Sequence, residues 1–210
     1  DILAENFKTG GLAKYGLDYE QLKDEFPGLV YCSITGFGHT GPYANRPGYD
    51  VLIQGMGGFM SVTGDPEGEV ARAGVAVVDF SSGLNAACGV LGALVDPDLK
   101  SKGRHVQVNL VDCGFALMGL QLVTYLMTGR VVARSGTQHP AMAPCKVYNA
   151  RDGKGMLIVI ANDHQFEAMC RLLGHEEWAT DPRYAKPAAR VENRDELNVL
   201  FQSNLEEQDR

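Results

Sequence analysis

Three aspartates stand in apolar surroundings at the expected starts of helices, so each is a candidate for chemistry. Asp79 follows the run Gly-Val-Ala-Val-Val, Asp50 follows Pro-Gly-Tyr, and Asp112 follows Asn-Leu-Val. A carboxylate at a helix start ordinarily caps free backbone N–H groups. Asp79 differs because it ends an extended apolar segment, the place where open α/β sheets gather their ligands and where a carboxylate can act as a nucleophile. The residues alone favour a cap at all three positions, with a nucleophile at Asp79 as the alternative.

Other kinds of catalytic or metal site lack their sequence signatures. The five histidines and five cysteines are scattered, without His-x-x-x-His or Cys-x-x-Cys spacing, so no zinc site is expected. The glycine-rich stretch at residues 36–42 matches neither a phosphate-binding loop nor a dinucleotide fingerprint. A Gly-x-Ser-x-Gly motif is also missing, which argues against an α/β serine hydrolase.

The elements expected around these acids alternate between strand and helix. The first residues have the look of a strand end, residues 29–34 form a continuous apolar run, and residues 105–110 alternate as a strand does. Helices are expected at residues 18–26, 80–95 and 111–128, the second of them rich in Gly and Ala for close packing. This order predicts a doubly wound α/β layer whose first units are missing.

The chain changes character after about residue 129. Residues 146–150 and 156–160 are two strand-like runs separated by a turn at residues 151–155, which is typical of a hairpin. Asn162 with Gln165, and Asn193 with Glu196, have the spacing of capping boxes, so a helix is expected after each. A hairpin followed by helices indicates a small α+β domain.

The composition of the chain indicates in which environment the protein works and which partners it has. A formal net charge of −7 argues against a general binder of nucleic acid or of a membrane surface. We expect no apolar run near the ~18–20 residues that cross a bilayer, and no signal peptide. Unpaired cysteines in apolar stretches indicate a reducing compartment, hence a cytoplasmic protein, or the mitochondrial matrix in a eukaryote. The abrupt start without Met and the polar helix at the end predict a fragment of a longer protein.

The sequence resembles the family III CoA-transferases, which include formyl-CoA, carnitine and succinyl-CoA:glutarate CoA-transferases and are related to α-methylacyl-CoA racemase. The resemblance runs through almost the whole chain. The motifs that carry it are Glu5-Asn-Phe-Lys-Thr-Gly, Tyr15-Gly-Leu-Asp-Tyr-Glu, Tyr31-Cys-Ser-Ile-Thr-Gly-Phe-Gly-His-Thr-Gly-Pro-Tyr, Arg46-Pro-Gly-Tyr-Asp, Gly74-Val-Ala-Val-Val-Asp-Phe-Ser-Ser-Gly, Lys102-Gly-Arg-His-Val-Gln-Val-Asn-Leu-Val-Asp and Gly136-Thr-Gln-His-Pro-Ala-Met-Ala-Pro.

The resemblance implies roles for four residues. The catalytic aspartate of the family falls on Asp79 and attacks the acyl-CoA thioester, which leads through a mixed anhydride to an aspartyl-CoA thioester. Asn6 and Phe7 match positions that line the CoA site. Lys14 falls where relatives place a basic residue near the CoA phosphates, and Lys in place of Arg keeps the charge but loses the bidentate fork. No permanently bound cofactor is implied, since CoA and acyl-CoA are substrates.

Two departures from the family pattern bear on the reaction. The racemase branch has a catalytic His where this chain has Tyr49, which disfavours two-base proton exchange and favours transfer. The formyl-CoA transferase branch has a run of glycines where this chain has Gly136-Thr-Gln-His-Pro, so a larger dicarboxylic acid fits at least as well as oxalate or formate. There His139 either orients a substrate carboxylate or packs on Pro140. A racemase-like epimerase and a non-catalytic CoA-binding paralogue remain alternatives.

The resemblance also implies an architecture. Residues 1–115 would be part of a Rossmann-like large domain, residues 116–143 a linker, and residues 144–210 the start of the small α+β domain. Family members are homodimers whose two chains interlock like rings, so the expected partners are a second copy, an acyl-CoA and a small carboxylic acid. Nucleic acid and membrane are not expected partners.

Overall fold

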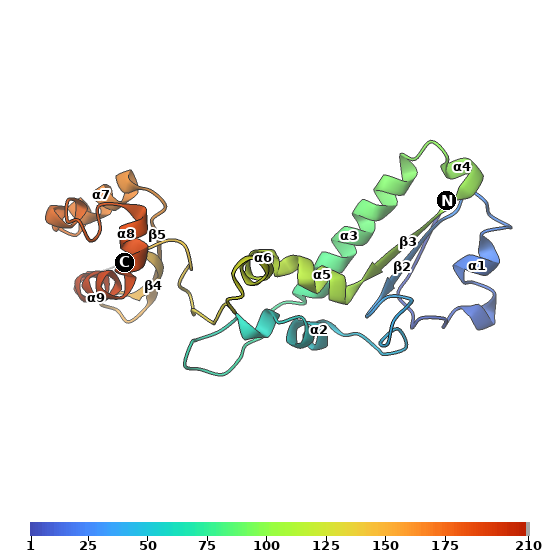
Figure 1. Cartoon of the computed structure of the whole chain (residues 1–210), viewed down its shortest axis with the longest axis horizontal. Helices are drawn as coiled ribbons and strands as arrows, with labels where there is room; N and C mark the ends of the chain where they lie inside the picture. Colours follow the sequence, from blue (N-terminus) through green and yellow to red (C-terminus); the bar gives the residue numbers. More distant parts are fainter. Residues whose placement is uncertain (209–210) are drawn as a thin grey trace. The chain divides into compact units, whose positions relative to one another are not determined.

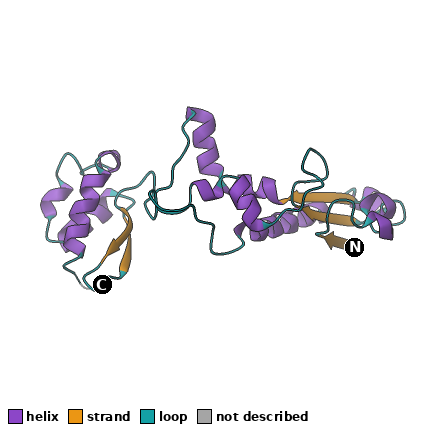
Figure 2. Ribbon diagram, turned by 90° about the horizontal axis from the view of Figure 1, so that it is seen from below, coloured by secondary structure: helices purple, strands orange, loops and turns teal. Residues whose placement is uncertain are grey.

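The computed structural model describes residues 1–208, the side chain of Lys100 excepted, and the chain divides into two compact units. The first unit holds residues 1–64 and 68–134, and the second holds residues 65–67 and the chain from Ser135 onward. Figure 2 shows that each unit combines strands with helices. The protein is therefore a mixed α/β structure with a small sheet in each unit.

A three-stranded parallel sheet forms the frame of the first unit. Its strands, in the order in which they pair, are β1 (Ile2–Glu5), β2 (Val30–Thr35) and β3 (Arg104–Asn109). The central strand β2 is buried along most of its length, with Val30 and Cys32 each 1% exposed, as its continuous apolar run predicts. The three expected strand regions in this unit are confirmed.

Helices connect the strands of this sheet. They are α1 (Tyr19–Leu22), α2 (Asp50–Met56), α3 (Val77–Leu94), α4 (Leu99–Lys102), α5 (Leu110–Leu117) and α6 (Gly119–Thr128), with short 3₁₀ turns η1 (Ala13–Tyr15) and η2 (Phe59–Ser61). Helix α3 packs against β2 and β3 (Figure 1). A Cβ on Gly89 of α3 would lie 2.6 Å from Cγ1 of Val106 on β3, so the small residue lets the helix approach the sheet closely.

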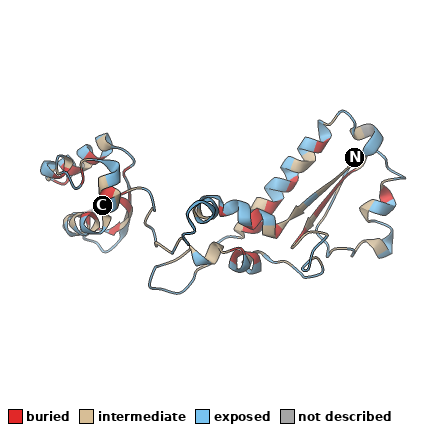
Figure 3. Ribbon diagram, in the orientation of Figure 1, coloured by how far each residue is buried: buried red, intermediate tan, exposed pale blue. Residues whose placement is uncertain are grey.

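Helix α3 begins earlier than predicted, and the residues directly before it do not form a strand. Residues 74–76 are not in a strand, Ala76 is the N-cap, and Val77 and Val78 are already helical. The prediction that Asp79 ends an extended segment is therefore wrong, because Asp79 lies in the first turn of a helix. Figure 3 shows that one side of α3 is buried against the sheet while exposed residues run along the other.

Two further expectations about apolar helices need correction. By length and composition α3 is apolar enough to cross a bilayer, contrary to the expectation that no run approaches that length. Its contacts with β2 and β3 are those of a helix that covers a sheet. The single helix expected over residues 111–128 is two helices, α5 and α6, which bend by 73° at Met118. Helix α6, inside the expected linker, belongs to the first unit.

The second unit is a hairpin covered by helices. Its elements are β4 (Cys145–Asn149), β5 (Gly155–Val159), α7 (Asp163–Leu172), η3 (Glu176–Ala179), α8 (Pro187–Glu192) and α9 (Arg194–Leu205). Strands β4 and β5 are antiparallel, so the hairpin prediction is confirmed. The core contains Tyr148 from β4, Phe166 from α7 and Phe201 from α9, each no more than 1% exposed.

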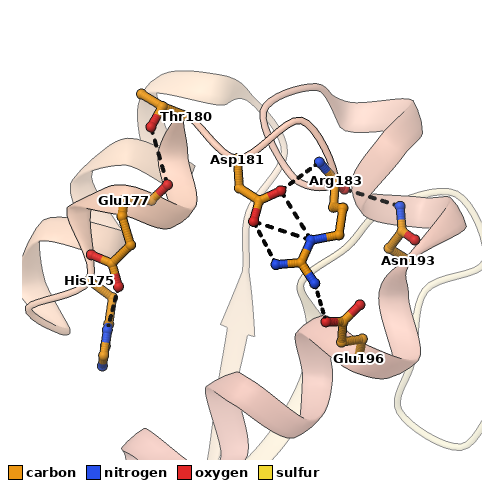
Figure 4. Close-up of polar contacts among 7 residues, drawn as sticks. All are labelled: His175, Glu177, Thr180, Asp181, Arg183, Asn193 and Glu196. Atoms are coloured by element: carbon orange, nitrogen blue, oxygen red, sulfur yellow. Dashed lines mark hydrogen bonds and ion pairs between the residues drawn. The ribbon is translucent and has the colours of Figure 1, made fainter.

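Of the two predicted capping boxes in this unit, the one at Asn162 forms in part, since Oε1 of Gln165 accepts the backbone N–H of Ala161 at 2.8 Å. The side chain of Asn162 accepts a hydrogen bond from the backbone N–H of Gln165 at 2.9 Å and starts α7. The helix expected after Asn193 is confirmed as α9, but the capping box does not form, because Asn193 makes no side-chain cap and donates to the carbonyl of Arg183 at 3.2 Å. Glu196 instead pairs with the guanidinium of Arg183, which also binds Asp181 (Figure 4).

Candidate active site

An open cavity of about 570 Å³ lies at the carboxyl ends of the three parallel strands. Its wall includes the residues that follow β1, the end of β2, and Leu110 directly after β3. Residues 46–49 and the start of α3 complete it. Open α/β sheets bind their ligands at this end, since the connections that leave the strands there can carry functional groups. The cavity is the first candidate for a substrate site.

Asp79 lines this cavity from the first turn of α3. Its side chain is exposed in this chain. Partial burial and, second, the negative charge of Asp50 raise the pKa of Asp79 above its ordinary value. A raised pKa makes the ionised carboxylate more basic and thus a better nucleophile, although it is protonated more readily as the pH falls. The cavity gives Asp79 room to meet a substrate.

Asp50 caps a different helix from the one in which it lies. It is in the first turn of α2, where the N-cap position belongs to Tyr49. One oxygen of Asp50 accepts the backbone N–H groups of Val78 at 2.8 Å and Asp79 at 3.2 Å, at the start of α3. The prediction of a capping role for Asp50 is confirmed in kind, but the helix it caps starts 27 residues later in the chain, at Val77.

The prediction that Asp112 caps a helix is wrong, because the cap is Asn109 and Asp112 binds that residue. Its backbone N–H donates to Oδ1 of Asn109 at 2.9 Å, and its carboxylate accepts from the amide of Asn109 at 2.8 Å. Asn109 is the N-cap of α5, so the two residues stabilise the start of that helix. Among the described residues that line the cavity, Asp79 is the one carboxylate.

Asn6, Phe7 and Tyr49 line the same cavity as Asp79, so four of the six predicted site residues are brought together. Asn6 and Phe7 directly follow β1, and the ring of Phe7 is 59% exposed, open to a ligand. Tyr49 is 67% exposed at the N-cap position of α2. An amide and two exposed rings around a carboxylate offer both hydrogen bonds and apolar contact.

The cavity contains two cationic side chains that the sequence analysis did not predict as site residues. Lys8 and Arg46 both line it. Lys8 is adjacent to the predicted pair Asn6 and Phe7, and Arg46 stands three residues before Tyr49, so their neighbours along the chain were the available signal. The guanidinium of Arg46 lies over the ring of Tyr43, 4.2 Å from its centroid. Two positive side chains suit a site for anionic substrates.

Lys14 is placed away from the described lining of this cavity. It is exposed in the turn η1, and its Nζ lies 4.8 Å from the centroid of the neighbouring Tyr15 ring. The turn follows the loop after β1, which carries Asn6 and Phe7 into the cavity. A role for Lys14 toward the phosphates of CoA stays a prediction.

His139 belongs to the second unit, whereas Asp79 belongs to the first. Its Nδ1 accepts the backbone N–H of Ala141 at 3.1 Å, and its backbone N–H donates to the carbonyl of Cys145 at 3.0 Å. Its own carbonyl accepts from Arg194 at 3.2 Å. These contacts hold the loop of His139 within its unit, and a role toward a substrate carboxylate stays a prediction.

A second cavity, of about 320 Å³, shares Lys8 and Thr9 with the first. His105 of β3 lines it, and the ring of His105 stacks on that of Tyr19 with centroids 4.5 Å apart. Nε2 of His105 lies 2.9 Å from Oγ of Ser33. Burial, and then the nearby His39, lower the pKa of His105, which favours the neutral ring.

The part of the chain that the structure describes holds no set of side chains suited to bind a metal ion. No group of three or more His, Cys, Asp or Glu side chains there is arranged to hold a metal ion. The cavity beside Asp79 instead presents one carboxylate, one amide and two cations, which is a set for binding and attacking an organic substrate.

The comparisons with known proteins show to which family the chain belongs. The model of CoA-transferase family III matches residues 1–210, the whole of the chain. The chain belongs to CoA-transferase family III. Relatives with curated names are a succinate–glutarate CoA-transferase of Agrobacterium fabrum, 44% identical over 96% of this chain, and an acetyl-CoA:oxalate CoA-transferase of Acetobacter aceti, 39% identical over 99%.

Solved structures of the family share this fold. A CaiB/BaiF family protein from Brucella suis is 45% identical, with a TM-score of 0.84 over 100% of this chain and 55% of that one. A protein of Mycobacterium tuberculosis is 28% identical, with a TM-score of 0.82 over 98% of this chain and 54% of that one. The family III chain spans about half the length of the curated relatives it matches, 50% of the A. fabrum enzyme and 54% of the A. aceti enzyme.

Proposed function

We propose that the protein to which this chain belongs transfers coenzyme A from an acyl-CoA to a carboxylic acid, with Asp79 as the covalent nucleophile. The observation that carries this proposal is the position of Asp79 in a cavity that Asn6 and Phe7 also line, in a chain that matches the family throughout. The names of the relatives support the reaction class, since both of those given above are CoA-transferases.

The first half of the reaction moves CoA onto the protein. A carboxylate oxygen of Asp79 attacks the thioester carbonyl, the C–S bond breaks, and CoA leaves as a thiolate, so that a mixed anhydride of Asp79 and the acyl group forms. The thiolate then attacks the Asp79 carbonyl of the anhydride. The donor acid leaves as a carboxylate, and Asp79 becomes an aspartyl-CoA thioester.

The second half runs the same steps with a new acid. The carboxylate of the acceptor attacks the aspartyl thioester and expels the CoA thiolate, which gives a second mixed anhydride. The thiolate attacks the acyl carbonyl of that anhydride, which forms the new acyl-CoA and frees the Asp79 carboxylate. No proton is gained or lost in the sum. Water must be excluded, because it would hydrolyse either intermediate.

The charges of the cavity suit these steps. Each attack is made by an anion, and each releases an anion, either a thiolate or a carboxylate. Lys8 and Arg46 line the cavity and can offset the repulsion between an anionic substrate and the Asp79 carboxylate. The raised pKa of Asp79 supports attack, because basicity and nucleophilicity rise together.

We propose a dicarboxylic acid as the acceptor. A second carboxylate gives Lys8 or Arg46 a group to bind while the first carboxylate reacts. The two relatives are named for dicarboxylic acids: succinate and glutarate in one name, and oxalate, beside acetyl-CoA, in the other. The loop of His139 lacks the glycine run of the formyl-CoA branch, so a larger dicarboxylic acid fits at least as well as oxalate.

We further propose that the chain holds part of a Rossmann-like large domain, in residues 1–115, and the start of a small domain, in residues 144–210, in an interlocked homodimer. The connecting residues 116–143 then include α6, which belongs to the first unit. The exposed side chain of Asp79 supports the homodimer, because a covalent mechanism needs cover that the first unit does not supply by itself. A cytoplasmic location, or a mitochondrial one in a eukaryote, completes the proposal.

The racemase alternative differs in a measurable proton transfer. Epimerisation beside a thioester needs a second base, and the family position of that base holds Tyr49. With a 2-methylacyl-CoA in deuterated water, we expect no deuterium at the α-carbon. Rapid incorporation would favour the racemase over the transferase.

The proposal is tested on the full-length protein with succinyl-CoA and a set of acids that includes glutarate and oxalate. We expect Asp79→Asn to lower kcat by about 10³-fold or more, since the nucleophile is gone. Asp112→Asn is the matched control, because Asp112 also lies in the first turn of a helix but its carboxylate binds only the side chain of Asn109, and its kcat should stay within about threefold. An Asp79→Asn protein with full CoA-transfer activity would contradict the proposal.

A further inference from the structure

The start of α3 is held by a carboxylate from another helix. The N-cap residue of α3 is Ala76, which has no side-chain acceptor for the free N–H groups of the first turn. Asp50 supplies one, since its Oδ2 accepts from Val78 at 2.8 Å and from Asp79 at 3.2 Å. The backbone of the nucleophile is therefore bonded directly to Asp50.

Asp50 is itself held by a buried amide. Nε2 of Gln54, one turn further along α2, donates to Oδ1 of Asp50. Oε1 of Gln54 accepts the backbone N–H of Ala73 at 2.8 Å, and Gln54 is 0% exposed. Gln54 thus joins Asp50 to the segment that leads into α3. A buried amide with both ends bonded has a fixed orientation, because any rotation would leave a buried polar group unsatisfied.

These bonds fix the chain on both sides of the turn that carries Asp79. Ala73 is held before the helix and Val78 within it, so the position of the Asp79 Cα follows from α2. The carboxylate of Asp79 then projects into the cavity from that position. In covalent catalysis a displacement of about 1 Å between the nucleophile and the reacting carbon can cost about 10²-fold in rate.

We propose that Asp50, oriented by Gln54, is a positioning residue that holds the backbone of Asp79 in place for attack and sets the negative charge behind it. The inference rests on the proposed function, because it needs Asp79 to be the nucleophile. Asp50 is outside the described lining of the cavity, so it acts through Asp79 and does not touch substrate.

The charge of Asp50 gives this role a signature that a purely structural cap lacks. Burial is the first cause of the raised pKa of Asp79, and the charge of Asp50 is the second. The other ionisable groups that face the cavity are Lys8, Arg46 and Tyr49. Neutralising Asp50 removes one of the two causes that raise the pKa of Asp79. The pKa of Asp79 therefore falls, and the acid limb of the pH–rate profile moves to lower pH.

The test uses two variants of the full-length protein that separate charge from position. Asp50→Asn keeps the shape, removes the charge and replaces one of the two accepting oxygens by an NH2 donor, and we expect kcat to fall about 10- to 100-fold while the acid limb moves to lower pH. Gln54→Met removes both bonds of the amide but keeps the charge of Asp50. We expect it to lower kcat without moving the acid limb to lower pH. The KM for acyl-CoA should stay within about threefold in both.

Asp18→Asn is the matched control. Asp18 caps α1 by accepting the backbone N–H of Gln21 at 2.9 Å, so this variant also neutralises a capping aspartate of the first unit. It should leave kcat and the acid limb unchanged. An Asp50→Asn protein with the activity and pH profile of the control would overturn the inference. So would an Asp50→Asn protein that loses activity with an unmoved acid limb, since that result assigns Asp50 a structural role alone.

The two proposals fail in different ways. If Asp79→Asn keeps full transfer, the proposed function fails and Asp50 has no nucleophile to position. If Asp79→Asn is inactive while Asp50→Asn and Gln54→Met both match the unaltered protein, the proposed function stands and only this inference fails. If Asp50→Asn does not fold, Gln54→Met decides alone, since unchanged kcat in that variant would contradict positioning through the amide.

Discussion

The backbone N–H of Asp79 donates a hydrogen bond to the carboxylate of Asp50, 3.2 Å away, although the two residues are 29 positions apart in the chain. The bond joins the first turn of α3 to the first turn of α2. It places a second negative charge close to the proposed nucleophile while it satisfies a free N–H group at the helix start. One contact thereby links the fold of the first unit to the chemistry of its cavity.

Asn6 tests whether the cavity binds acyl-CoA through the residues after β1. We expect Asn6→Ala to raise the KM for acyl-CoA about 10-fold, because a lost hydrogen bond to a bound ligand costs about 1–1.5 kcal/mol. The kcat should change less, since Asn6 is not a reacting group. Steady-state kinetics of the full-length protein measure both. Asn85→Ala, on the exposed side of α3, is the control, and an equal KM in the two variants would refute the role of Asn6.

Gly48 tests how the wall of the cavity is held. A Cβ on Gly48 would lie 2.3 Å from the Cα of Gly36, and both glycines line the cavity. Gly48→Ala must push apart the end of β2 and the segment before Tyr49, so we expect the free energy of unfolding to fall by about 1–3 kcal/mol. Urea denaturation measures the change. Gly74→Ala, where a Cβ meets nothing within 4 Å, should show no such loss, and equal midpoints for the two would contradict the close packing.

His105 tests the pH dependence of stability. Burial lowers the pKa of His105 below its ordinary value of 6.5 in the folded protein. As the pH falls through 6.5, the unfolded chain therefore takes up the proton before the folded one does, and stability is lost until the pH reaches the folded pKa. Replacing His105 by Gln removes this loss.

The measurement compares urea midpoints at pH 7.5 and pH 5.5, values of about one unit on either side of the free imidazole pKa. We expect the midpoint to drop less on acidification in His105→Gln than in the unaltered protein. His164→Gln, at an exposed position on α7, should retain the full drop. A His105→Gln protein with the same drop as the control would contradict the assignment.

Local signals predicted the elements that local contacts hold. The apolar run at β2, the two runs of the hairpin and the cap at Asn162 each depend on residues within a few positions of one another. The motifs of the family then singled out Asp79, Asn6, Phe7 and Tyr49, which the structure brings to one cavity.

The predictions that proved wrong concern segments whose local structure is determined by residues distant in the sequence. Val75, Val77 and Val78 have β propensity, yet Asp50 caps the turn that follows Ala76, so α3 starts at Val77. Glu196 was expected to complete a box with Asn193, but a charged partner 13 positions earlier, Arg183, takes it. In both cases a contact between elements outweighs a preference of a few residues, and no local pattern reveals it.

The central claim, covalent attack by Asp79, is tested most directly by trapping the intermediate. Full-length protein is incubated with succinyl-CoA, treated with hydroxylamine or borohydride, digested, and examined by mass spectrometry. We predict a hydroxamate or an alcohol on the peptide that contains Asp79, and none when Asp79→Asn is treated in the same way. Active transfer with an unmodified Asp79, or with the adduct on another residue, would contradict the account.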